Sequence, residues 1–365
     1  MVDILLMHSR INELLGGSET YLPLLEYFSR EAGVEFPQGE DTAEKTRKAR
    51  MKILVSNAFM SEEFKRINVN FRENGIQFLL LKGLMMEILY PPGTRPFSDI
   101  DLLVRKQDIE RAGRILSKMG FEENIEPRQG LVQARKNAGF SKKGRLPVMV
   151  ECHYRLGPCP YLDRPSPYLL LRDSAEYEIY GMRTRGLSPE DILIHLALHA
   201  FSHIPAPCAI SLCDIRQVIY LMGKKINWES FVSKVEKDNL WMPVRMAFKR
   251  GAEILDIPFP AEVMEMLFSF IPGPVERARF TLLQSPSRSK SNMGKLSFGM
   301  RTVRKLRLTV YMVFPSKRYL EKRYGKKGNV NLLVSFLRYS WEGISSAASW
   351  FRENYIKLSF PSRVP

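Results

Sequence analysis

Two aspartates stand two positions apart in a β-prone run, and their spacing suggests a chemistry. In an extended chain Asp99 and Asp101 send both carboxylates to one face. Ile100, Leu102 and Val104 leave the opposite face, where they can anchor the strand in a core. Paired carboxylate oxygens suit a divalent cation such as Mg²⁺ that itself holds phosphate. The sequence therefore predicts a metal and phosphate site at the start of this strand.

A third acid lies in the middle of another predicted strand, residues 147–154 (PVMVECHY). Glu151 and His153 leave the same face of that strand, away from its valines and cysteine. Because an unpaired buried carboxylate is costly, Glu151 needs a strong partner. That partner is either a Lys or Arg side chain, or a metal shared with Asp99 and Asp101. His153 either acts as a base toward an acceptor or orients Glu151.

Four residues that precede the aspartates could contact phosphate. Lys82 and Gly83 follow the apolar run IQFLLL and precede a short predicted helix, LMMEILY, whose first N–H groups could face an anion. Arg95 either neutralises the aspartates or reaches a triphosphate. Ser98 either caps a turn or donates to a phosphate. A Lys-Gly turn alone is common, so this interpretation depends on the aspartates downstream.

Three histidines recur at steps of four in ILIHLALHAFSH, which places His195, His199 and His203 along one stripe of a predicted helix. The helix start is marked by Ser188-Pro-Glu-Asp. Such spacing can bind zinc, but the sequence offers neither an HExxH glutamate nor a clear fourth ligand. The alternative is a set of hydrogen-bonded histidines packed where two domains meet.

The elements that must position these residues form a chain of 365 residues with four predicted parts. Residues 1–74 are expected to be helical, a lid or packing layer to which we assign no chemistry. Residues 75–187 carry the candidate site, and 188–273 are again helical. Residues 274–365 form a basic helical segment. No signal peptide and no spanning run is predicted, and four cysteines without CxxC spacing favour reduced thiols in the cytoplasm.

The positive charge is concentrated near the C-terminus. The whole chain has a net charge of +16, and residues 275–328 contain 15 Lys and Arg against two acids, a net charge of +13. Within them, MRTVRKLRLTVYMVF alternates basic and apolar residues as a basic amphipathic helix does. It either packs on the protein with a solvated face, or lies on an anionic membrane surface such as the inner face of the cell membrane, or contacts RNA phosphates.

The order of these motifs is more specific than any one of them. LLLKG, YP, RPFSDIDLLV, VECHYRL and LIHLALHAFSH, in this order, resemble a family of uncharacterised bacterial nucleotidyltransferases, the type 5 NTP-transferases. The resemblance covers about residues 20–260 and extends to the superfamily related to DNA polymerase β. It implies an α+β fold: a polymerase β-like nucleotidyltransferase core with a small mixed sheet, flanked by N-terminal and C-terminal helical regions.

The resemblance also implies roles for the site residues. Asp99, Asp101 and Glu151 would hold two Mg²⁺ ions, and Lys82 with Gly83 would form the phosphate turn. The sequence departs from the family pattern in two ways. The usual Gly-Ser reads Gly83-Leu84 here, so a phosphate-contacting hydroxyl is missing, and the spacing from Gly83 to Asp99 is slightly long. Lys82 or Ser98 could replace the hydroxyl.

The implied activity is transfer of a nucleoside monophosphate from an NTP to a hydroxyl acceptor, with release of pyrophosphate. The acceptor is a small molecule, a protein or RNA. Two alternatives remain at this point. One is a non-catalytic nucleotide-binding or scaffolding protein whose basic tail docks on a membrane or RNA. The other is a toxin-type transferase that acts on tRNA and binds it through the tail, with a steep dependence on salt.

Overall fold

The computed structural model describes residues 18–31, 33, 35–36, 39–124, 137–144, 146–157, 165–202, 208–271, 273, 334, 336–337 and 341. The chain divides into two compact units, residues 1–124 with 136–271 and residues 125–135 with 272–365. Every element described below belongs to the first unit. The predictions for the basic segment 275–328 lie outside the described residues, as does His203.

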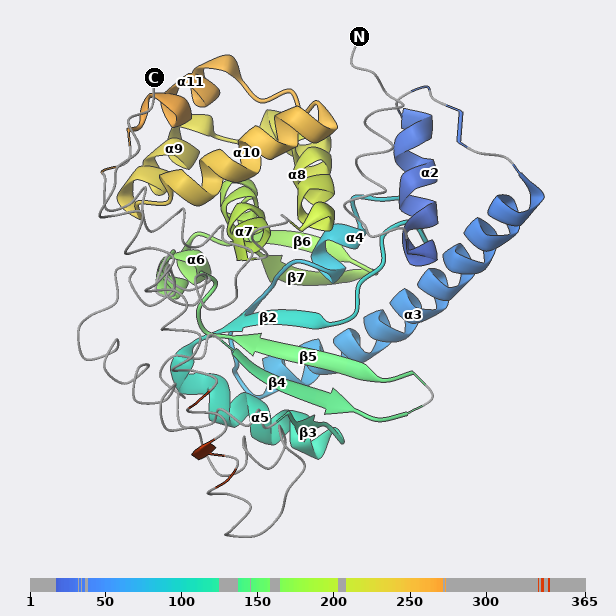
Figure 1. The fold of residues 1–365 in the computed structure, drawn as a ribbon. Helices are drawn as coiled ribbons and strands as arrows, with labels where there is room; N and C mark the ends of the chain where they lie inside the picture. Colours follow the sequence, from blue (N-terminus) through green and yellow to red (C-terminus); the bar gives the residue numbers. More distant parts are fainter. Residues whose placement is uncertain are drawn as a thin grey trace. The chain divides into compact units, whose positions relative to one another are not determined.

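A seven-stranded mixed sheet forms the centre of the first unit, in the order β3-β4-β5-β2-β1-β7-β6 (Figure 1). β2 pairs with β5 and β1 with β7 in parallel, and the other pairs are antiparallel. The strands are β1 (Phe78–Leu80), β2 (Ile100–Val104), β3 (Glu122–Glu123), β4 (Asn137–Lys142), β5 (Val148–His153), β6 (Ala175–Ile179) and β7 (Met182–Gly186). This sheet, combined with helices, confirms the predicted α+β class.

Helices precede, interrupt and follow the sheet strands along the chain. The N-terminal ones are η1 (Glu19–Tyr21), α2 (Leu22–Glu31) and α3 (Glu40–Glu73). Those among the strands are α4 (Leu84–Glu87), η2 (Lys106–Asp108), α5 (Ile109–Lys118) and α6 (Pro167–Arg172). The last group comprises α7 (Pro189–Ser202), α8 (Ala209–Met222), η4 (Gly223–Lys225), α9 (Trp228–Lys237), α10 (Trp241–Leu255) and α11 (Ala261–Ser269).

The long helix α3 and the helix α5 cover one face of the sheet. Phe64 and Phe71 of α3 meet Phe78 of β1 edge-on, with ring centroids 6.3 and 5.7 Å apart. On α5, Gly113 lies against the ring of Phe140 from β4, so close that a Cβ would come within 3.1 Å of it. Figure 1 shows the first half of α3 continuing beyond the sheet, beside α2. There Arg50 of α3 pairs with Glu26 of α2, so this half of the helix has neighbours other than the sheet.

The same face of β2 holds the apolar residues that the alternation predicts. Phe78 pairs with Val104 and Leu80 with Leu102, so these side chains point to the α3 side. Ile100, Leu102 and Val104 are all 0% exposed, which confirms that they anchor the strand. Asp101 therefore points to the opposite face.

Helices α7 to α11 form a layer of their own next to the sheet (Figure 1). Stacked aromatic rings pack α9 against α10. The ring centroids of Phe231 on α9 and Phe248 on α10 are 5.4 Å apart, and those of Phe248 and Phe259 are 4.1 Å apart. These helices span the predicted helical part 188–273, but they fall in the same compact unit as the sheet. The four-part division therefore stays a prediction.

One predicted helix is shorter in the structure. The run LMMEILY forms a single turn, α4, which ends after Glu87, before the turn residues that lead to Pro91. One turn aligns few peptide dipoles, so the N-terminus of α4 attracts an anion less strongly than that of the longer helix predicted from the sequence.

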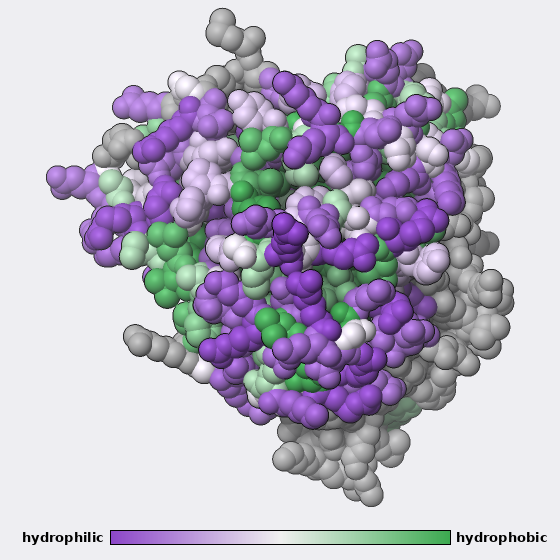
Figure 2. All heavy atoms as spheres, turned by 180° about the vertical axis from the view of Figure 1, so that it is seen from behind, coloured by the Kyte–Doolittle hydropathy of each residue, from purple (hydrophilic) through white to green (hydrophobic). Residues whose placement is uncertain are grey.

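The surface view in Figure 2 is dominated by hydrophilic residues with scattered apolar patches. Among the described residues, no helix is both long enough and apolar enough to cross a membrane.

Candidate active site

The site residues come together because β2 and β5 are parallel neighbours in fixed register. Asp101 pairs with Glu151, and Leu103 pairs with His153. Residues that pair across two strands share a face, and side chains two apart on one strand do too. Asp101, Glu151 and His153 therefore all leave the sheet on the face opposite α3 and α5.

Asp101 is fully buried, and protein donors meet both of its oxygens. Lys82 Nζ lies 2.6 Å from Oδ2, and His153 Nε2 lies 2.7 Å from Oδ1. The same His153 nitrogen lies 3.2 Å from Glu151 Oε2. An ionised carboxylate can only accept, so Nε2 carries the hydrogen and donates it to Asp101. His153 thus holds two carboxylates in place, as one of its two predicted roles requires.

These contacts set the charges of the site. Burial opposes ionisation of Asp101, but the hydrogen bond from His153 and the charge of Lys82 outweigh it and lower the pKa of Asp101 well below its usual value. Burial also opposes the charge on Lys82, but the charges of Asp101 and Asp99 outweigh it and raise its pKa. The site therefore holds a charged Lys82 and an ionised Asp101 in direct contact.

Asp99 stands immediately before β2 and completes the acidic group. Burial, and next the negative charge of Asp101, raise the pKa of Asp99 above its usual value. Asp99 and the exposed Ser98 line a cavity of about 870 Å³, together with Lys82 and Gly83. Lys82 and Gly83 of the predicted turn thus meet Asp99, the first of the two paired aspartates, at one cavity.

Gly83 is required by the shape of its turn. Its φ of +65° with ψ of −106° lies where side-chain-bearing residues are strained. A Cβ at this position would lie 3.3 Å from the carbonyl oxygen of Asp99. The chain thus passes close to the start of β2 here, and this approach is what brings Lys82 to Asp101.

Arg95 has an ion-pair partner other than Asp99 or Asp101. Its Nε and Nη2 donate to the two carboxylate oxygens of Asp214 on α8, at 2.9 and 2.6 Å. Tyr90 donates to the same carboxylate at 3.0 Å. Arg95 and Asp214 are 5% and 1% exposed, so this is a buried pair that joins the loop before β2 to α8. The role of Arg95 in nucleotide binding stays a prediction.

The histidine stripe of α7 packs against its neighbours. His195 is buried, and His199 Nδ1 lies 2.7 Å from Ser211 Oγ of α8. Within the described ranges, the group of side chains spaced to hold a metal is Asp101, Glu151 and His153, whose ligand atoms lie within 4.8 Å of one another. Neither His195 nor His199 belongs to it. His199 and Ser211 line the cavity instead.

The donor set of that group fits a hard cation. Two carboxylates point to one face, and Glu151, with 29% of its side chain exposed, offers oxygen toward solvent. Each carboxylate oxygen has more than one lone pair, so the bonds of Asp101 to Lys82 and His153 leave further acceptor capacity. Asp101, Glu151 and the neighbouring Asp99 are the residues that would hold Mg²⁺.

The sequence analysis missed the contribution of α3. Lys45, Lys48, Lys52, Ser56 and Asn57 all line the cavity. Their spacing follows the helical repeat, but the same pattern is typical of a solvated helix face, so no local signal marked them.

Solved structures similar to this chain include three nucleotidyltransferase-related proteins. The antibiotic-resistance factor ANT(2'')-Ia is 18% identical, and the match covers 53% of this chain and 92% of that one, with a TM-score of 0.33. A nucleotidyltransferase-like antigen from Paracoccidioides brasiliensis is 15% identical over 52% and 92%, with a TM-score of 0.33. The lincosamide antibiotic adenylyltransferase LnuA, in a lincomycin-bound structure, is 14% identical over 43% and 94%, with a TM-score of 0.30.

A search of curated proteins finds no match. The model of one protein family, described as uncharacterised nucleotidyltransferase, matches residues 20–256. That range contains β1, β2 and β5 with all of their site residues, and it extends through most of the helical layer. The chain therefore belongs to this family of nucleotidyltransferases and is an enzyme that transfers nucleotides.

Proposed function

We propose that the protein transfers a nucleoside monophosphate from an NTP to a hydroxyl acceptor in an Mg²⁺-dependent reaction that releases pyrophosphate. The observation that carries this proposal is the pairing of Asp101 with Glu151 on parallel strands, with Asp99 beside them at the cavity. Carboxylates gathered together, of which Asp99 lines a cavity of about 870 Å³, suit a cation-bound triphosphate better than they suit a structural role.

In this reaction an acceptor oxygen forms a bond to the α-phosphorus, and the bond from that phosphorus to the bridging oxygen of the β-phosphate breaks. Pyrophosphate leaves with the electron pair, and the proton of the acceptor hydroxyl passes to solvent. Bound Mg²⁺ would neutralise the charge that gathers on the phosphoryl oxygens and lower the pKa of the attacking hydroxyl. The carboxylates of Asp99, Asp101 and Glu151 would fix where that charge is neutralised.

The protein's own side chains keep this arrangement rigid. Lys82 and His153 each hold one oxygen of Asp101, so the carboxylate cannot rotate freely. His153 also lies 3.2 Å from Glu151, which aligns the third acid with the first two. With its Nε2 hydrogen donated to Asp101, His153 acts in this proposal as a positioning residue for the carboxylates. Such preorganisation is a large part of electrostatic catalysis.

The test is to incubate the protein with each α-labelled NTP and Mg²⁺ in cell extract, and to follow both the labelled product and pyrophosphate. We expect one molecule to become labelled with equal release of pyrophosphate. Glu151→Gln keeps the shape of the side chain and should abolish both signals with folding intact. Glu176→Gln, which removes an exposed carboxylate on β6, is the matched control and should change neither. NTP binding without pyrophosphate release would support the non-catalytic alternative instead.

The class of the acceptor and any contact of residues 275–328 with RNA or a membrane stay predictions. The proposed activity needs none of those contacts, because the residues that carry it lie in the sheet and around the cavity.

A further inference from the structure

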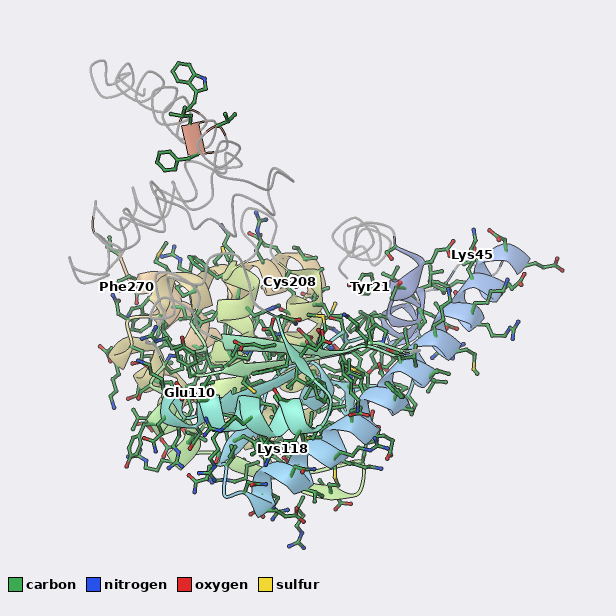
Figure 3. The ribbon with its side chains drawn as sticks, turned by 90° about the horizontal axis from the view of Figure 1, so that it is seen from below. Tyr21, Lys45, Glu110, Lys118, Cys208 and Phe270 are labelled. Atoms are coloured by element: carbon green, nitrogen blue, oxygen red, sulfur yellow. The ribbon has the colours of Figure 1, made fainter. Side chains whose placement is uncertain are left out.

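The cavity beside the carboxylates has a wall made by one face of α3. Residues 45, 48, 49, 52, 53, 56 and 57 line it, a spacing of three and four that selects a single side of the helix. On this side Ala49, Ile53 and Asn57 are buried, whereas Lys45 is half-buried and Lys48 and Lys52 are exposed. Figure 3 labels Tyr21 and Lys45 near the start of the chain and Cys208 at the start of α8, and all three line this cavity.

The three lysines form a row along the helix. At 1.5 Å per residue, Lys45 and Lys52 are separated by about 10 Å along the axis of α3. Lys52 is nearest in sequence to Ser56 and Asn57, and Asn57 donates to the carbonyl oxygen of Arg95 at 3.1 Å. The row therefore starts close to the loop that leads to Asp99 and runs away from it. A chain of several phosphates is a ligand of matching length and charge.

The other two cations of the cavity are already held by buried acids. Lys82 is paired with Asp101 at 2.6 Å, and Arg95 with Asp214 at 2.6 Å, with both acids 0–1% exposed. If either cation turned away to a phosphate, it would leave a buried carboxylate without its counter-charge, which is costly. Lys82 and Arg95 are thus poorly placed to neutralise a triphosphate tail.

The lysine row is held only weakly. Lys45 contacts Asp41 and Glu19 at 2.8 and 3.5 Å, and both of these acids are largely exposed. Lys48 contacts the exposed Glu44. In the part of the chain that the structure describes, Lys52 has no ion-pair partner. Exposed ion pairs are weak and exchange readily for a stronger anion such as phosphate.

We propose that Lys45, Lys48 and Lys52 bind the β- and γ-phosphates of the NTP, so that α3 supplies the cations for the pyrophosphate leaving group. The inference rests on the proposed function and names a site for the part of the substrate that leaves. It also assigns a binding role to the N-terminal helical region, because the lysines lie in the first half of α3, which extends past the sheet. Lys82 then serves to hold Asp101, and Arg95 to hold α8.

The experiment uses inorganic tripolyphosphate with Mg²⁺ as the probe, because it carries the tail without a base or a sugar. Calorimetry on the full chain should give about tenfold weaker binding for Lys52→Gln and a larger loss for the Lys48→Gln/Lys52→Gln double variant. Orthophosphate binding should change little, because one phosphate cannot span the row. The melting temperature should stay unchanged, since both lysines are exposed.

Arg47→Gln is the matched control. Arg47 lies on α3 between the lysines, has the same charge, is exposed and does not line the cavity. It should leave tripolyphosphate binding as in the unchanged chain. Equal losses in Arg47→Gln and Lys52→Gln would reduce the effect to general electrostatics and overturn the site, as would no loss in the lysine variants. In the transfer assay the lysine variants should raise KM for the NTP. If transfer occurs and that KM is unchanged, the inference fails while the proposed function stands.

Discussion

Arg95 and Asp214 are 119 residues apart in sequence, yet they form a two-pronged buried ion pair that joins the loop before β2 to helix α8. The pair forms part of the cavity wall. It therefore links the position of the helical layer to the position of the acidic residues.

Removing one partner of this pair should destabilise the protein strongly. Asp214→Asn leaves the Arg95 guanidinium buried without its counter-charge, and such changes cost about 3–5 kcal/mol in the free energy of unfolding. Urea denaturation measures the loss. Asp173→Asn is the control, because it removes an exposed pair with Arg172 and should shift the denaturation midpoint little. Similar midpoints for the two variants would contradict the buried pair.

Alanine variants at two glycines can distinguish the cost of backbone strain from an effect on the site. Gly83 and Gly181 have φ of +65° and +74°, so Ala at either position should cost about 1–2 kcal/mol of stability. An added Cβ at Gly181 meets nothing within 4 Å, whereas at Gly83 it lies 3.3 Å from the Asp99 carbonyl oxygen. Transfer activity should therefore fall in Gly83→Ala and persist in Gly181→Ala. Equal activity in the two variants would show that the turn does not set the geometry of Asp99.

The role of His153 can be tested with one variant that keeps an N–H donor near the position of Nε2 and another that removes it. Gln places an N–H near the position of Nε2 and cannot act as a base at neutral pH, whereas Ala removes the donor. If His153 only positions Asp101 and Glu151, His153→Gln keeps most of the activity and the shape of its pH profile. His153→Ala should lose about 10–100-fold, as is common when a residue that orients metal ligands is removed. Equal losses in the two variants would make His153 the base.

Thiol alkylation should report on the cavity. Burial, and next the charge of Glu151, raises the pKa of Cys152 to about 12, so its thiol is almost entirely protonated and unreactive at pH 8. Cys213 is also buried, and burial raises the pKa of its thiol well above the usual value. Cys208 is half-buried and lines the cavity. Iodoacetamide should therefore modify Cys208 first in a Cys159→Ser background, as mass spectrometry can measure.

Tripolyphosphate should slow this modification if it enters the same cavity. In urea all three remaining cysteines should react at similar rates, which provides the reference for unprotected thiols. Rapid labelling of Cys152 in the folded protein would contradict its burial behind the site.

Strands β2 and β5 and the acids on them could be predicted from the sequence because strand alternation is a local rule. Asp101 between Ile100 and Leu102, and Glu151 between Val150 and Cys152, fix which face each carboxylate takes. If the apolar faces of β2 and β5 are buried in the same core, their acids lie on the same side of the sheet. Helix α7 was also predictable from local signals, namely the residues at its start and the four-residue spacing of its histidines.

The partners of the cations could not be predicted, because they depend on segments far apart in the chain. Nothing near Arg95 points to Asp214, and Lys82 could equally have faced a phosphate. The lysine row of α3 was missed because a charged helix face has the same pattern whether it meets solvent or a cavity. Only the packing of α3 against the rest of the fold distinguishes the two.

The register between β2 and β5 also constrains how this family can vary over evolution. Insertion or deletion of one residue in β5 before Glu151 would turn Glu151 and His153 toward α5 and bring an apolar side chain to the face of the candidate site. Homologous chains should therefore differ in length at the connections between strands, while these two strands keep a constant residue count.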